Sequence, residues 1–209
     1  MDCKIPKNFY AFEYGWHKGI DFDKEAEALL KVLNNATKEN DLQRYIKQNE
    51  KWFIPASIFE CFDFGHHEAY LVPEQPLANN YRADYMLMGR NSLGYHIVFV
   101  EFEDVNVDYR LQNANVESNP VRKGLAQIKD WNRWFQDNRK FFLDNNGLSE
   151  IAGNIPPWGI WYVLVVGRRD RMDNNVNQMR GEMLREGIGI KIISYDRLVD
   201  NVRLLSNGF

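Results

Sequence analysis

Several features that mark other classes of protein are scarce in this sequence of 209 residues. It has two cysteines, Cys3 and Cys61, which give neither a disulfide framework nor a CxxC metal motif. We therefore expect a reducing, cytoplasmic environment. The first residues lack the charged-then-apolar layout of a signal peptide, and no apolar run approaches the ~20 residues that span a bilayer. No membrane partner is expected.

An excess of charge of one sign is also absent. Lys and Arg number 26 and Asp and Glu number 29, so the net charge of −3 argues against the strongly basic surface of a nonspecific nucleic-acid binder. P-loop, GxGxxG and GxSxG motifs are missing. The length predicts one domain, or one domain with an appended helical subdomain. Hydrophobic residues make up 44% and aromatic residues 14%, which is enough for a sizeable core. Basic residues cluster only locally, at Arg122-Lys123, Arg133, Arg139-Lys140 and Arg168-Arg169 with Arg171.

The order of patterns along the chain predicts an α/β or α+β fold, a sheet flanked by helices. An aromatic N-terminal arm is expected over residues 1–22, followed by one domain over 23–209 that begins with two helices, capped by Asp23 and Asp41. The Pro73–Pro76 segment predicts a loop, since its prolines lack an amide donor, and residues 104–120 predict a long loop. Strands are predicted at 58–64, 68–72, 82–88, 95–103, 158–166 and 188–194, and further helices at 121–141, 174–186 and 195–205.

Acidic residues stand on two neighbouring strands. Asp84 lies on one, and Glu101 and Glu103 end the next, after a buried β-branched and aromatic run. Because side chains alternate along a strand, Glu101 and Glu103 share one face. Burying both is costly without a compensating positive charge, and a divalent metal such as Mg²⁺ is one candidate. The alternative is a solvated rim at the end of a strand.

The helix that follows carries a possible third part of the site. Lys123 and Gln127 are four residues apart, so they lie on one face at the edge of its apolar stripe. An amide and an ammonium beside carboxylates could position a water or a phosphate oxygen. The alternative is an ordinary solvated helix face.

The order of these motifs resembles the Shedu anti-phage family, which belongs to the PD-(D/E)xK nuclease superfamily. The resemblance covers roughly residues 40–200. It rests on Arg-Ala-Asp84, Val-Glu101-Phe-Glu103, Gln127-Ile-Lys-Asp-Trp and the closing Ile190-Lys-Ile-Ile-Ser-Tyr-Asp196-Arg-Leu198.

This resemblance implies a restriction-endonuclease-like mixed sheet and a metal-dependent endonuclease acting on double-stranded, nicked or ended DNA. Asp84 and Glu101 would hold Mg²⁺, with Mn²⁺ a substitute, and the carbonyl of Phe102 would be a further ligand. Gln127 matches a helix glutamine of many members. Glu74 is a candidate auxiliary acid, or simply a loop residue.

One position departs from the superfamily pattern, because Glu103 stands where E-x-K has lysine. Such an E-x-E version is expected as a trait of Shedu-type domains, with Glu103 holding a metal or acting as a general base. Lys123 could supply the missing positive charge. Two alternatives stay open: a degenerate nuclease fold serving as a nucleic-acid-binding or assembly module, and a magnesium-dependent hydrolase of nucleotides.

Two further groups have competing interpretations. His66-His67 could bind a transition metal but lacks a third ligand at suitable spacing, so a surface turn is the stronger interpretation. Trp131 and Trp134 could stack on bases, or pack in the core or between subunits. The aromatic arm and this Trp-rich helix together predict a homo-oligomer.

Overall fold

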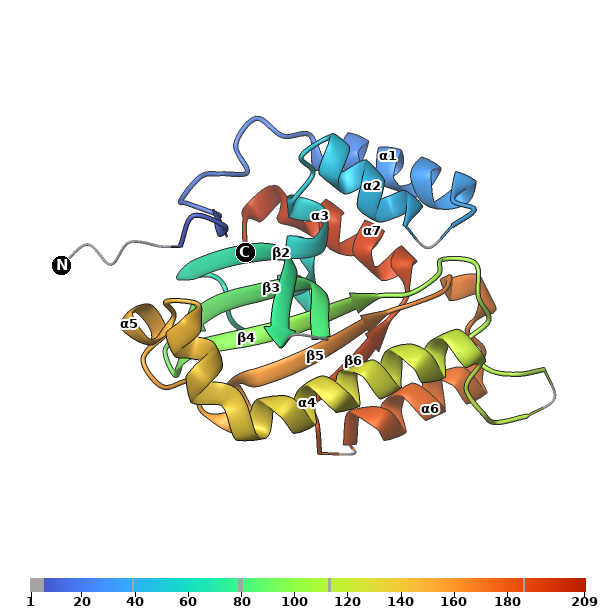
Figure 1. The fold of residues 1–209 in the computed structure, drawn as a ribbon. Coiled ribbons are helices and arrows are strands. Elements are labelled where there is room, and N and C mark those ends of the chain that lie inside the picture. Colours follow the sequence, from blue (N-terminus) through green and yellow to red (C-terminus); the bar gives the residue numbers. More distant parts are fainter. Residues whose placement is uncertain (1–5, 39, 79–80, 113, 186) are drawn as a thin grey trace.

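The fold is built on a single mixed sheet. The computed structural model describes residues 6–38, 40–78, 81–112, 114–185 and 187–209. Within these residues the sheet has six strands in the order of the chain (Figure 1). They are β1 (Tyr10–Ala11), β2 (Glu68–Ala78), β3 (Tyr81–Asn91), β4 (Gly94–Phe102), β5 (Ile160–Val165) and β6 (Ile190–Ile193). The mixed α/β architecture confirms the predicted fold class.

The direction of each strand follows from its connection. β1 to β4 are antiparallel, and β3 and β4 are joined by a two-residue turn between Asn91 and Gly94. Gly94 has a φ of 120°, which glycine adopts without strain. β4, β5 and β6 are parallel, because their connections cross over through α4 (Asn119–Asn145) and α6 (Asn174–Arg185). The short α5 (Ser149–Ala152) lies between α4 and β5.

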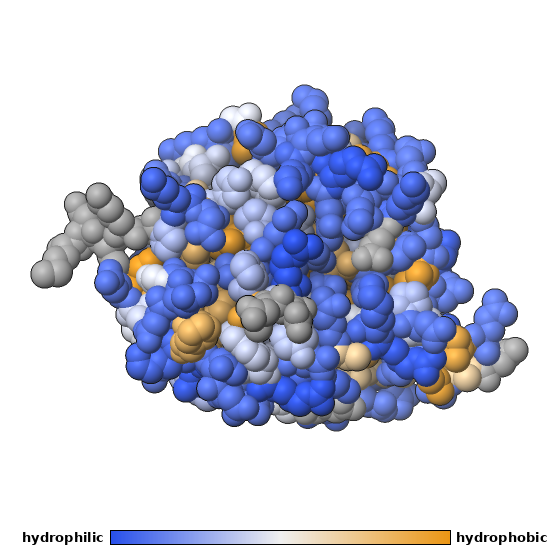
Figure 2. Space-filling model, in the orientation of Figure 1, coloured by the Kyte–Doolittle hydropathy of each residue, from blue (hydrophilic) through white to orange (hydrophobic). Residues whose placement is uncertain are grey.

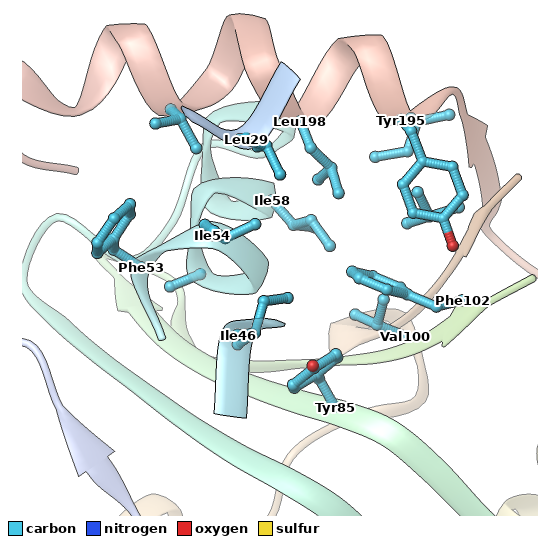
Figure 3. Close-up of a cluster of buried hydrophobic side chains, with 14 of the residues drawn as sticks. Leu29, Ile46, Phe53, Ile54, Ile58, Tyr85, Val100, Phe102, Tyr195 and Leu198 are labelled. Carbon is cyan, nitrogen blue, oxygen red and sulfur yellow. The ribbon is translucent and has the colours of Figure 1, made fainter. Parts of the chain in front are cut away.

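Helices cover both faces of the sheet (Figure 1). One face carries α1 (Phe22–Asn35), α2 (Asp41–Gln48), α3 (Phe53–Ala56) and α7 (Tyr195–Leu204), and α4 and α6 lie on the other. The alternating side chains of β4 join two separate cores: Val98, Val100 and Phe102 face α1 and α7, whereas Ile97 and Phe99 face α4. Figure 3 shows Val100 and Phe102 in the first core, close to Tyr195 and Leu198. The buried central strand was therefore predicted correctly.

Two predictions for residues 58–76 are wrong. The apolar run at 58–64 forms a 3-10 segment, Ser57–Cys61, after α3 rather than a strand. A short apolar run has no period that separates a buried strand from a buried helical turn. The expected loop Pro73–Pro76 is part of β2, with Pro73 opposite Tyr85. Because β1 pairs with β2 only at Tyr70 and Leu71 in the described residues, this stretch lies at a sheet edge, where proline is tolerated.

The helix starts and the arm also differ in detail from the predictions. α1 is capped by Asp21, whose carboxylate accepts from the Lys24 amide at 3.1 Å, and not by Asp23. Asp41 is the first residue of α2, and its carboxylate accepts from the preceding Thr37 and Lys38 amides. In the arm, Phe12 and Trp16 pack against the first core and Phe209. Residues 1–5, including Cys3, lie outside the described residues.

Candidate functional site

The sheet divides between β3 and β4 at Asp84. Backbone pairing of the two strands ends at Tyr85 and Val100. Beyond that point Asp84 Oδ2 accepts a hydrogen bond from the Phe102 amide at 2.7 Å. A side-chain carboxylate has thus replaced the backbone carbonyl that would continue the ladder. This bond holds the Asp84 carboxylate against Phe102, the residue that follows Glu101 in the sequence.

Glu101 lies on the opposite side from the first core, under α4. It is 6% exposed, and its Oε1 accepts from Gln127 Nε2 at 2.8 Å. The faces of β4 alternate as predicted, since Val100 and Phe102 point into the other core. Gln127, which the helical spacing predicted, therefore orients the Glu101 carboxylate, which the strand pattern predicted.

The backbone of Glu103 makes two hydrogen bonds to other parts of the chain. Its amide donates to the Val165 carbonyl at 2.9 Å, and its own carbonyl accepts from the Tyr195 hydroxyl. The side chain is 2% exposed, while that of Lys123 is 61% exposed and places Nζ 3.5 Å from Glu103 Oε1. Lys123 thus extends from the helix surface to a buried carboxylate. A positive charge stands beside the position where E-x-K would carry its lysine.

Gly124 is a site residue that sequence reasoning missed. A Cβ there would lie 2.7 Å from Leu164 Cδ1 and 3.0 Å from Glu103 Cγ. The absent side chain therefore gives Glu103 its space beneath α4. The available signal was a glycine inside a helix, which costs about 1 kcal/mol relative to alanine and suggests a packing reason.

The C-terminal motif Ile190–Leu198 contacts the same end of β4 through Tyr195. Tyr195 is fully buried and packs edge-on against Phe102, with ring centroids 5.6 Å apart (Figure 3). Asp196 accepts three hydrogen bonds from the Arg168 guanidinium and one from the Arg169 amide. Burial opposes ionisation, but these bonds outweigh it and lower the pKa of Asp196 below its ordinary value. Asp196 therefore joins the start of α7 to the segment that follows β5.

On the side away from α4, Asp84 opens onto a cleft of about 360 Å³ between α2 and the end of the β2–β3 pair. Glu74 lines the same cleft, within 3.4 Å of Lys47 Nζ and 3.9 Å of Arg82 Nη1. It belongs to β2 with a left-handed φ of 51°, so the loop alternative for Glu74 is wrong.

The donors at the strand end suit a hydrated cation. The described residues contain no group of three or more His, Cys, Asp or Glu side chains that could hold a metal ion. Asp84 and Glu101 supply carboxylates, and the Phe102 carbonyl lies on the same strand edge as the amide that donates to Asp84. Magnesium keeps several waters and is commonly bound through one or two carboxylates. Asp84, Glu101 and the Phe102 carbonyl are therefore the groups that could hold Mg²⁺ together with waters.

The remaining candidates are a histidine pair and two tryptophans. His66 and His67 are exposed neighbours in a turn, with ring centroids 4.6 Å apart. Trp131 is fully buried in the second core, which excludes stacking on bases, and Trp134 packs edge-on against Phe135 and Phe142. Packing, the alternative interpretation of both tryptophans, is confirmed.

A mixed six-stranded sheet with helices on both faces and acidic residues at a dividing strand end is consistent with α+β proteins of nuclease-like fold. The family model described as "Shedu protein SduA, C-terminal" matches residues 36–199, more than half of the chain. The protein belongs to this anti-phage defence family. No curated protein matches the sequence. Among the described helices, none is both long and apolar enough to cross a membrane.

Proposed function

We propose that the protein is a metal-dependent endonuclease that hydrolyses DNA phosphodiester bonds in defence against phage. One observation carries the proposal: Asp84 is bonded to the Phe102 amide, and Glu101 and Glu103 beside it meet Gln127 and Lys123 of α4. These contacts involve all five side chains expected from the sequence and support the proposal. A solvated rim does not account for them, because Glu101 and Glu103 are buried.

The residues divide the chemistry among them. Asp84, Glu101 and the Phe102 carbonyl would hold Mg²⁺, or Mn²⁺ as a substitute. When bound, the ion polarises the scissile phosphate and lowers the pKa of a coordinated water. Gln127 keeps the Glu101 carboxylate oriented through its 2.8 Å bond.

Glu103 and Lys123 complete the reaction. A carboxylate within hydrogen-bond reach of the attacking water accepts its proton, a contribution of roughly 100- to 10,000-fold, and we assign that role to Glu103. Lys123 balances Glu103 at 3.5 Å. Its exposed stem allows the ammonium to move to a phosphate oxygen, where it would stabilise the charge that develops in the transition state.

The test is cleavage of supercoiled plasmid and of linear DNA with Mg²⁺, Mn²⁺ or EDTA. Asp84→Asn and Glu101→Gln keep the shape of each side chain and remove its charge. We expect each to lower metal-dependent cleavage by about 1,000-fold or more, because charge stabilisation at the phosphate is lost. Glu150→Gln, at an exposed glutamate of α5, is the matched control and should cleave as the wild type does.

A second candidate is a degenerate fold that binds nucleic acid or serves in assembly without cleaving. The Lys123–Glu103 pair favours it, because this ammonium can neutralise the buried carboxylate without a metal. Under this alternative neither DNA substrate is cut, and calorimetry detects no binding of Mg²⁺. A magnesium-dependent nucleotide hydrolase is a third possibility, which competition between long duplex DNA and free nucleotides separates from the first.

We also propose a homo-oligomer, now on different grounds. Several of the aromatic side chains that motivated it, among them Phe12, Trp16 and Trp131, pack within the chain. Tyr14, Phe141 and Trp158 stay on the surface, with exposed fractions of 99%, 61% and 55%. Figure 2 shows one face that is mostly hydrophilic, with small separated hydrophobic spots. Light scattering at micromolar concentration tests the proposal, and a monomer would contradict it.

A further inference from the structure

The cleft beside Asp84 has a composition that cleavage chemistry alone does not explain. Its walls come from three separate parts of the chain: the N-terminal arm, the α2–α3 region and the β2–β3 edge. They combine an aromatic pair, two side-chain amides and two cations. These residues are Tyr10 with Trp52, Asn40 with Gln43, and Arg44 with Lys47.

The aromatic wall is only partly buried. Tyr10 stacks on Trp52 with ring centroids 4.7 Å apart and 27° between the planes, yet Tyr10 remains 42% exposed. Trp52 is half-buried against the first core and holds the pair in place. A fixed aromatic surface in a polar cleft is the arrangement on which a nucleobase stacks, irrespective of which base it is.

The polar wall offers complementary groups. The amides of Asn40 and Gln43 carry both donors and acceptors, which suits the edge of a base. Lys47 is 70% exposed and 3.4 Å from Glu74, and Arg44 is 58% exposed and 3.3 Å from Asp41. Exposed pairs of this kind are weak, so either cation can turn to a phosphate. With Glu74 and Asp84 in the same cleft, one phosphate is accommodated better than a charged triphosphate chain.

We propose that this cleft binds one unpaired nucleotide of a DNA strand and holds its phosphate with Arg44 or Lys47, beside the proposed metal site at Asp84. The inference rests on the proposed nuclease function and names the form of its substrate. A base within a duplex has both faces covered by its neighbours, so stacking on Tyr10 requires a nucleotide that is single-stranded or extruded. The cleft of about 360 Å³ falls within the usual range for one small ligand, roughly 300–1,000 Å³.

Binding of fluorescein-labelled DNA, followed by anisotropy in EDTA, tests the inference without any cleavage. Two duplexes are compared that differ only by one unpaired adenine. The wild type should bind the duplex with the unpaired adenine more tightly. Tyr10→Ala should weaken that binding by about tenfold and leave the paired duplex unchanged. Tyr10→Phe should retain it, because the ring and not the hydroxyl provides the stacking surface.

Tyr14→Ala is the matched control, since Tyr14 belongs to the same arm, lies outside the cleft and is 99% exposed. Gln43→Ala, on the opposite wall, tests the cleft a second time and should also weaken binding of the unpaired adenine alone. Circular dichroism establishes that each variant is folded. Equal binding of the two duplexes by the wild type, or equal losses in Tyr10→Ala and Tyr14→Ala, would overturn the inference.

Competition with free dAMP separates a nucleotide within a strand from a free one. Displacement of the labelled duplex by dAMP at the concentration at which unlabelled oligonucleotide displaces it would assign the cleft to free nucleotides and overturn the inference. The proposed function can fail separately. A preference for the unpaired adenine without metal-dependent cleavage would support the inference and contradict the proposed nuclease function. Metal-dependent cleavage without this preference would support the proposed function and contradict the inference.

Discussion

The two sides of the acidic strand end differ in how tightly they are built. On the α4 side, Glu101 and Glu103 are buried and Gly124 leaves no room for even a methyl group. On the α2 side, the cleft is lined by exposed side chains such as Arg44, Lys47 and Glu74. Asp84 stands between the two. Reaction chemistry needs fixed groups, whereas recognition of varied sequences benefits from groups that can rearrange.

After the two metal-ligand variants Asp84→Asn and Glu101→Gln, the largest expected effect concerns Lys123, an exposed residue that reaches the buried Glu103. Lys123→Gln should lower metal-dependent cleavage by about 100-fold, because one positive group is lost at the phosphate. Lys123→Arg should recover part of the activity. Plasmid nicking rates measure both, and Lys140→Gln is the control, at a lysine of the same helix that is 87% exposed. Unchanged cleavage in Lys123→Gln would show that Glu103 and not the phosphate is the partner of this ammonium.

The next effect is on packing at the closed side. Gly124→Ala should destabilise the fold by about 1–3 kcal/mol, because the new methyl group overlaps Leu164 and Glu103. Cleavage should fall with it, since Glu103 is displaced. Gly181→Ala is the opposite case: that glycine lies in α6 with open space around its Cβ position, so alanine should stabilise by about 0.5–1 kcal/mol.

Urea denaturation measures the free energy of unfolding of both variants. If Gly124→Ala were as stable as Gly181→Ala, α4 would not be held tightly against the acidic strand. The comparison between a closed and an open side would then lose its main support.

The smallest effect concerns pH. The folded-state pKa of Asp196 is below the ordinary value of 3.8, so its pair with Arg168 stabilises the fold above that value. This contribution is lost as the pH falls through the lower folded pKa. Arg168→Met should therefore flatten the acid side of the stability profile, by less than about 1.4 kcal/mol per pH unit. Thermal unfolding between neutral and acidic pH measures how stability changes with pH in the wild type and in Arg168→Met. Identical slopes in the two proteins would show that the Asp196–Arg168 pair adds no acid sensitivity.

Local patterns predicted much of the candidate site because the face on which a side chain lies depends only on its position along the strand or helix. Alternation along β4 was enough to place Glu101 and Glu103 on one face, and helical spacing placed Gln127 and Lys123 toward them. The same reasoning failed for residues 58–64 and for Pro73–Pro76. In those segments, burial and position in the sheet decide the backbone, and neither is encoded in a short window of residues.

By itself, the sequence determined the strands and helices that carry the acids, since side-chain periodicity reports which face is buried. Only the tertiary structure decided that the Asp84 carboxylate meets the Phe102 amide, that Gly124 makes room for Glu103, and that Tyr10 and Asp84 line one cleft. These contacts join residues far apart in the chain. They depend on where the sheet divides and how closely a helix approaches it, which are results of packing the whole domain.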